Sequence, residues 1–104
     1  GCTLHINTGK VPYHPEAYEL AEMGVIPAGA YRNRAYAGAG VKTAPRVTRA
    51  MEDICYDPQT SGGLLLAVPA AAAADCLAEL QGALPQTAAI GCVTERGGAP
   101  VYLE

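Results

Sequence analysis

Residues 1–68 show two hydrophobic patterns and one unbroken apolar run. Apolar and polar residues alternate through residues 2–7, and a period of two predicts a half-buried strand. From Pro15 the apolar positions recur at helical spacing, and Gly24 can end that helix because glycine tolerates the left-handed conformation. Residues 64–68 are all apolar, which is typical of a strand buried on both faces. These patterns predict a strand, a helix and a central core strand.

The remaining elements complete an α/β (α+β) pattern. A second helix is predicted from Pro69 to about Gln81, and strands are predicted at 88–94 and 101–103 with a hairpin turn at 96–98. Residues 31–49 have no clear period and are expected to form a long loop, and 51–55 either a short turn of helix or an irregular segment. A strand, helix and strand in succession imply a crossover and a mixed sheet. We therefore expect residues 1–104 to form a single domain, a mixed β-sheet of about four strands covered by helices.

Composition limits the classes of protein that fit. The chain has 104 residues, half of them apolar, with no Phe and no Trp, so one core of Ala, Val, Leu, Ile and Tyr is expected. A net charge of −3 gives no reason to expect nucleic-acid binding. No apolar run approaches about 18 residues, and no signal peptide is recognisable, so no membrane association is expected. The chain opens on Gly1 and not on Met, which indicates a fragment or processed product of a longer protein.

The four cysteines are Cys2, Cys55, Cys76 and Cys92. None forms a C-x-x-C pair, which argues against a zinc or thioredoxin-like site. Each lies among apolar residues, so the expectation is buried, reduced cysteines in a cytosolic protein. Cys2 and Cys92 would be neighbours if their strands paired.

The stretch YDPQTSGGLLLAV, residues 56–68, carries the strongest candidate chemistry. Asp57-Pro58 favours a turn, and Asp57 itself either caps that turn or approaches a metal. The next residues offer hydroxyls and flexible backbone NH groups that could hold an oxyanion or phosphate: Thr60, Ser61, Gly62 and Gly63. The alternative is a structural turn whose glycines only allow close packing. The stretch lacks the Gly-Lys-Ser/Thr of a Walker loop.

Five of the seven basic residues lie within residues 32–49, with no acid among them: Arg32, Arg34, Lys42, Arg46 and Arg49. One interpretation is an anion-facing loop, because guanidinium groups suit phosphate. The other is a loop that leaves its charges in water, the ordinary state of Lys and Arg. No nucleophile–base pair is recognisable, and His5 and His14 are too isolated to form a pair of metal ligands; His5 is expected on the exposed face of the first strand and His14 at the helix entry.

Two segments resemble a known family. DPQTSGGLL and ELAEMGVIPAGAYRNR (residues 19–34) are similar, in order and spacing, to the C-terminal domain of selenophosphate synthetase (selenide, water dikinase), of the aminoimidazole ribonucleotide synthetase superfamily. Ala28 departs from the family, which more often has Gly there. In that family nucleotide lies chiefly against the N-terminal domain, and this half closes one side of the cleft. The resemblance therefore implies that the candidate cleft-facing, cofactor-binding residues are Arg32, Asn33, Thr60, Ser61, Gly62 and Gly63. Asn33 has an alternative interpretation as a turn residue bonded to its own backbone.

For the full-length protein, the resemblance implies a cytoplasmic homodimer that uses ATP and Mg²⁺ to convert selenide to selenophosphate, AMP and phosphate. The reactive Cys or selenocysteine, the essential Lys and the metal-binding Asp residues would lie upstream of Gly1, so no catalytic or metal-binding residue is expected here and the fragment should be inactive alone. Its partner would be its own N-terminal domain. The alternatives are a sister enzyme, such as thiamine-monophosphate kinase, the hydrogenase-maturation protein or aminoimidazole ribonucleotide synthetase itself, or a non-catalytic dimerisation or interaction module.

Overall fold

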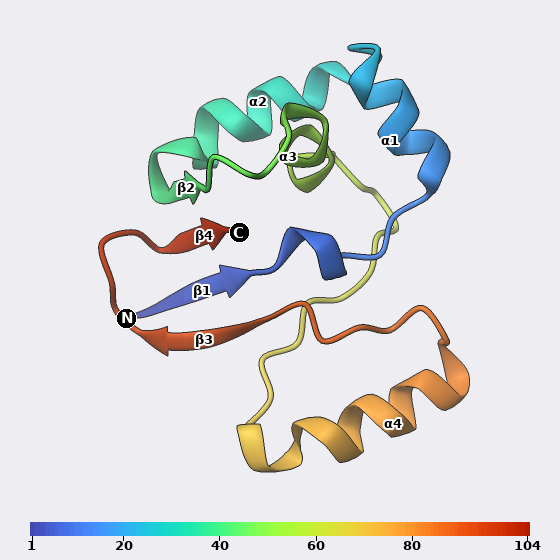
Figure 1. The fold of residues 1–104 in the computed structure, drawn as a ribbon, viewed down its shortest axis with the longest axis vertical. Coiled ribbons are helices and arrows are strands. Elements are labelled where there is room, and N and C mark those ends of the chain that lie inside the picture. The colour runs from blue at the N-terminus through green and yellow to red at the C-terminus, as the bar shows by residue number, and fades with distance from the viewer.

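A four-stranded mixed sheet lies at the centre of the structure (Figure 1). Its strands are β1 (Cys2–Ile6), β2 (Val41–Thr43), β3 (Gly91–Glu95) and β4 (Val101–Leu103), in the order β2-β4-β1-β3. β1 pairs antiparallel with β3 and parallel with β4, and β2 pairs parallel with β4. The computed structural model describes all 104 residues. It confirms the α+β class and the mixed four-stranded sheet.

Three of the four α-helices lie together on one side of the molecule, and the fourth stands apart beyond β3 (Figure 1). They are α1 (Pro15–Glu22), α2 (Ala28–Ala37), α3 (Arg49–Cys55) and α4 (Ala73–Ala83), with short 3₁₀ turns η1 (Thr8–Lys10), η2 (Gly38–Gly40) and η3 (Ala70–Ala72). As predicted, α1 begins at Pro15 and ends just before Gly24, whose φ is +77°. No helix has both the length and the apolar character needed to cross a bilayer.

The core is small and built mainly from alanine. Only 11 of the 104 residues are buried, and the apolar ones are Ala21, Ala30, Ala50, Met51, Tyr56, Ala99 and Leu103. They come from α1, α2, α3, the residue that follows α3, and the region of β4, whereas β3 and α4 contribute none. Because so little apolar surface is buried, polar contacts between the elements carry unusual weight in this fold.

The predicted central strand at residues 64–68 is wrong. This segment pairs with no other strand, and its side chains are exposed, Leu64 by 90% and Leu65 by 63%. Both edges of β1 are already occupied, by β3 and β4, so the centre of the sheet has no free position. The fourth strand instead comes from Val41–Thr43, inside the region expected to be a loop. An apolar run has the same sequence pattern whether or not it finds a partner.

The region 31–49 is therefore not a long loop, because it contains most of α2, then η2 and β2. Residues 96–98 do not form a hairpin turn either, since β1 lies between β3 and β4 in the sheet. The helix expected over 69–81 is present as η3 followed by α4, but Gly82 lies inside α4 and does not end it.

The expectation that the cysteines are buried is also wrong. Cys2, Cys55 and Cys92 are exposed and Cys76 is half-buried, and all four are free thiols. Although β1 and β3 pair, their register places Cys92 opposite His5 and Cys2 opposite Glu95. Cys2 and Cys92 are therefore not cross-strand neighbours.

Candidate functional site

One face of α2 contacts Tyr56 and Pro58, the first residues of the 56–63 stretch. The side-chain amide of Asn33 donates a hydrogen bond to the carbonyl oxygen of Tyr56, at 2.9 Å. The guanidinium of Arg34 lies over the Tyr56 ring, 4.6 Å from its centroid. A Cβ atom at Gly29 would lie 2.5 Å from Cγ of Pro58, so α2 approaches the proline ring as closely as only glycine allows. Gly29 and Asn33 are four residues apart on one face of the helix. The two segments that resemble the known family therefore meet in space.

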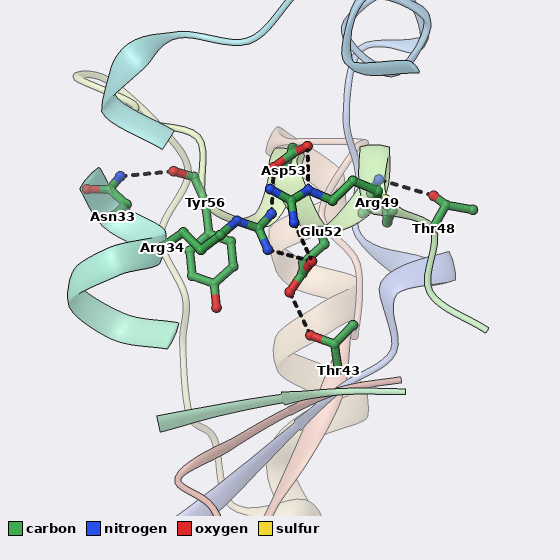
Figure 2. A network of polar contacts seen from close by, with 9 residues as sticks. Asn33, Arg34, Thr43, Thr48, Arg49, Glu52, Asp53 and Tyr56 are labelled. Carbon is green, nitrogen blue, oxygen red and sulfur yellow. Dashed lines mark hydrogen bonds and ion pairs between the residues drawn. The ribbon is translucent and has the colours of Figure 1, made fainter. Parts of the chain in front are cut away.

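A cluster of ion pairs fastens α2 to α3 behind this contact (Figure 2). Nη1 of Arg34 lies 2.5 Å from Glu52, and its Nη2 lies 2.5 Å from Asp53. Nε of Arg49 adds a 3.2 Å contact to Asp53, and the Thr43 hydroxyl donates to Glu52 at 2.9 Å. The Asp53 side chain is only 7% exposed, so its charge depends on these partners. The cluster joins α2, α3 and β2 where the apolar core is thin.

The electrostatics of this cluster favour its charged state. Partial burial acts to raise the pKa of Glu52, but hydrogen bonds from Arg34 and Thr43 and the nearby arginine charges lower it below its ordinary value near 4.5. Burial likewise acts to lower the pKa of Arg34, and the bonds to Glu52 and Asp53 raise it nevertheless. Arg34 and Glu52 therefore remain an ion pair throughout the neutral range.

Acid is expected to weaken the folded state through Glu52. Because its pKa is lower in the folded than in the unfolded chain, its contribution is fully present above about pH 4.5 and is lost as the pH falls through the folded value. Urea titrations should show the free energy of unfolding falling between roughly pH 5 and pH 3, with a shallower fall in Glu52→Gln. Glu79→Gln, on the exposed part of α4, is the matched control and should keep the original slope. An unchanged slope in Glu52→Gln would contradict this assignment.

The structure leaves the predicted loop residues open to solvent. Thr60, Ser61, Gly62 and Gly63 are all exposed, and neither hydroxyl makes a hydrogen bond within the chain. Neither glycine has a positive φ. Gly62 instead makes room for the side chain of Gln59, whose Cβ would lie 2.9 Å from a Cβ at position 62. The loop therefore offers free donors but does not by itself form a closed cradle.

Arg32 and Asn33 have different surroundings. Arg32 is exposed on α2 and makes no ion pair. Asn33 is also exposed, but it lies within that helix and its side-chain amide bonds to the carbonyl of Tyr56, so it is not a turn residue bonded to its own backbone. The structure brings Asn33, but not Arg32, into contact with the 56–63 stretch.

Two of the five basic residues in 32–49 form ion pairs with acidic residues outside that segment. Arg34 and Arg49 are engaged by acids that follow the segment in sequence, at positions 52 and 53. The sequence patterns did not single out these acids or Gly29 as parts of the site. Arg49 and Asp53 are, however, four residues apart on a helix, a spacing that favours an ion pair. Arg32, Lys42 and Arg46 remain without ion pairs.

The metal-ligating side chains of the chain are scattered and do not gather in one cluster. No group of three or more His, Cys, Asp or Glu side chains is arranged to hold a metal ion. His14 stands at the N-terminal end of α1, as expected. His5 is only partly exposed: it stacks on Tyr102 with ring centroids 5.1 Å apart, and its Nδ1 lies 3.0 Å from a carboxylate oxygen of Glu104.

The fold and the site define an α+β domain that presents an open polar loop between α3 and α4. No protein-family model matches the chain. It is 44% identical over 90 residues to the selenide, water dikinase of Pelobacter propionicus. The aligned region covers 86% of this chain and 26% of that protein. It is 41% identical over 101 residues to that of Treponema denticola (92% and 28%) and 32% identical over 102 residues to that of Clostridium botulinum (98% and 30%). The chain belongs to the selenide, water dikinase (selenophosphate synthetase) family. It spans less than a third of the length of these curated relatives.

Proposed function

We propose that the chain is the C-terminal domain of a selenophosphate synthetase and works inside a longer enzyme. That enzyme would make selenophosphate from selenide and ATP, releasing AMP and phosphate. The observation that carries the proposal is the match to selenide, water dikinases from separate organisms over 86–98% of this chain. The whole enzyme is proposed to be a cytoplasmic homodimer that requires Mg²⁺ and that contacts neither nucleic acid nor membrane directly.

In this proposal the chain contributes one wall of the nucleotide cleft. The free hydroxyls of Thr60 and Ser61 and the backbone NH groups of the loop suit phosphate oxygens, since such donors are strongest toward anions. Asn33 and Gly29 hold the start of the loop against α2 and need not touch the ligand. ATP would supply the phosphoryl group, and the Mg²⁺ ligands are proposed to lie in the rest of the enzyme. The N-terminal domain of the same protein is the proposed partner.

The direct test is selenide-dependent AMP release. A parent protein that contains this chain should release AMP and phosphate when given selenide, ATP and Mg²⁺, whereas the chain alone should release none. Thiamine monophosphate in place of selenide tests the sister enzyme class, and turnover of that substrate alone would overturn the proposal. Selenide-dependent AMP release by the isolated chain would contradict the division of labour between the two parts.

A binding experiment tests the role of the loop separately. Mg-ATP, and then ADP with phosphate, is titrated into the isotope-labelled chain while backbone amide shifts are followed. Saturable shifts confined to residues 57–63 and 32–49 would assign part of the phosphate pocket to this domain. No shift at millimolar nucleotide would mean that this domain is a wall and a scaffold only.

The second candidate, a non-catalytic dimerisation or interaction module, is favoured by one observation. Leu64, Leu65 and Leu66 are exposed by 90%, 63% and 55%, side by side in a segment without a strand partner. Exposed apolar patches often mark sites of association. Sedimentation of the isolated chain and of a variant with Leu64 and Leu66 changed to Ser tests this candidate: a dimer lost in the variant supports association through the leucines, and a monomeric isolated chain argues against it.

A further inference from the structure

A cavity lies between η1, α1 and the segment that leads into α3. It has a volume of about 220 Å³ and is open to solvent. Its walls include Tyr13, Tyr18, Arg46, Val47, Thr48 and Met51. None of its lining residues belongs to the 56–63 stretch, so it is distinct from the loop discussed above.

The aromatic wall of this cavity, formed by Tyr13 and Tyr18, is preorganised by contacts within the chain. The rings of Tyr13 and Tyr18 lie with centroids 5.9 Å apart and planes tilted by 30°. The Tyr18 hydroxyl lies 3.0 Å from Oγ1 of Thr48, and that oxygen also accepts a hydrogen bond from the backbone NH of Met51. Tyr13 is 43% exposed, so part of its surface remains available. A ligand would therefore meet a preformed aromatic wall, which lowers the entropic cost of binding.

The charge in the cavity is positive and unpaired. Arg46 makes no ion pair and no side-chain hydrogen bond, unlike Arg34 and Arg49, which are bound to Glu52 and Asp53. No carboxylate lines the cavity. A guanidinium fork pairs best with the two oxygens of a carboxylate or phosphate.

We propose that this cavity binds a small planar organic anion, with its ring against Tyr13 and its carboxylate or phosphate on Arg46. The volume is below the roughly 300 Å³ at which pockets for drug-sized ligands begin, so a single ring fits better than a larger molecule. Val47 and Met51 supply apolar contact beside the aromatic wall. The proposal does not depend on the function of the parent enzyme.

The test uses phenyl phosphate as the probe and the isotope-labelled chain as the protein. Saturable amide shifts are expected at Gly9, Val47 and Thr48. Arg46→Gln should weaken binding about 10-fold or more, because a hydrogen bond to a charged group is lost. Tyr13→Leu should weaken it about 3-fold or more, because ring stacking is lost. Arg96→Gln, which removes an exposed arginine outside the cavity, should change nothing.

Matched probes separate the ring from the charge. Inorganic phosphate lacks the ring, benzyl alcohol lacks the charge, and cyclohexanecarboxylate has a charge but a non-planar ring. Each should bind less tightly than phenyl phosphate or benzoate. The proposal is overturned by equal binding of inorganic phosphate, by equal effects of Arg46→Gln and Arg96→Gln, or by the absence of saturable shifts at millimolar phenyl phosphate.

Discussion

Replacing Arg34 with methionine is expected to lower the free energy of unfolding by about 3 kcal/mol or more. Methionine keeps much of the length of the side chain but removes the only group that contacts both Glu52 and Asp53 at 2.5 Å. The side chain of Asp53 is only 7% exposed and would keep its charge without its principal partner. Removing one partner of a buried ion pair lowers the free energy of unfolding by about 3–5 kcal/mol. Arg49 compensates little, since its side chain is 62% exposed and solvent screens its charge.

Urea unfolding measures this effect, with two comparisons. Arg32→Met lies on the same helix but is exposed and unpaired, so it should stay within about 0.5 kcal/mol of the original chain. Adding Asp53→Asn to Arg34→Met removes the orphaned charge and should restore part of the lost stability. Equal losses in Arg32→Met and Arg34→Met would show that the cluster contributes nothing specific.

Changing Gly29 to alanine is expected to reduce the activity of the parent enzyme about 10- to 100-fold. The added Cβ would lie 2.5 and 2.9 Å from two carbons of the Pro58 ring, which cannot rotate away. Either α2 or the 56–63 stretch must then shift, and a misplacement of about 1 Å can cost on the order of 100-fold in rate. This result rests on the proposed function, in which that stretch faces the nucleotide.

Gly82→Ala is the matched control for this substitution. A Cβ at Gly82 would meet nothing within 4 Å, and its position inside α4 means that alanine should stabilise the chain by about 0.5–1 kcal/mol without changing activity. In the isolated chain, Gly29→Ala should move the amide resonances of residues 56–63, whatever reaction the parent enzyme performs. Unmoved resonances would refute the contact itself, whereas moved resonances with unchanged activity would refute only the role of the loop in catalysis.

The sequence by itself determined the elements whose signals are local. β1, α1 and β4 were predicted from alternation, from a proline at a helix start and from a short apolar run, because these signals act between near neighbours in the chain. The resemblance of residues 19–34 and 57–65 also pointed to the family that the comparisons show. The two segments it singled out are the two that meet at Tyr56 and Pro58.

The tertiary structure decided the rest, because the partners lie far apart in sequence. α2 has no apolar period of its own, and Asn33 and Arg34 fasten it to residues 56, 52 and 53. The apolar run at 64–68 was expected in the sheet, yet Val41–Thr43 takes the fourth position, since pairing depends on which edges are free. The need for glycine at position 29 arises only from a proline ring 29 residues later. A local pattern indicates which secondary structures a segment can form. Long-range contacts then determine which of these structures the folded chain contains.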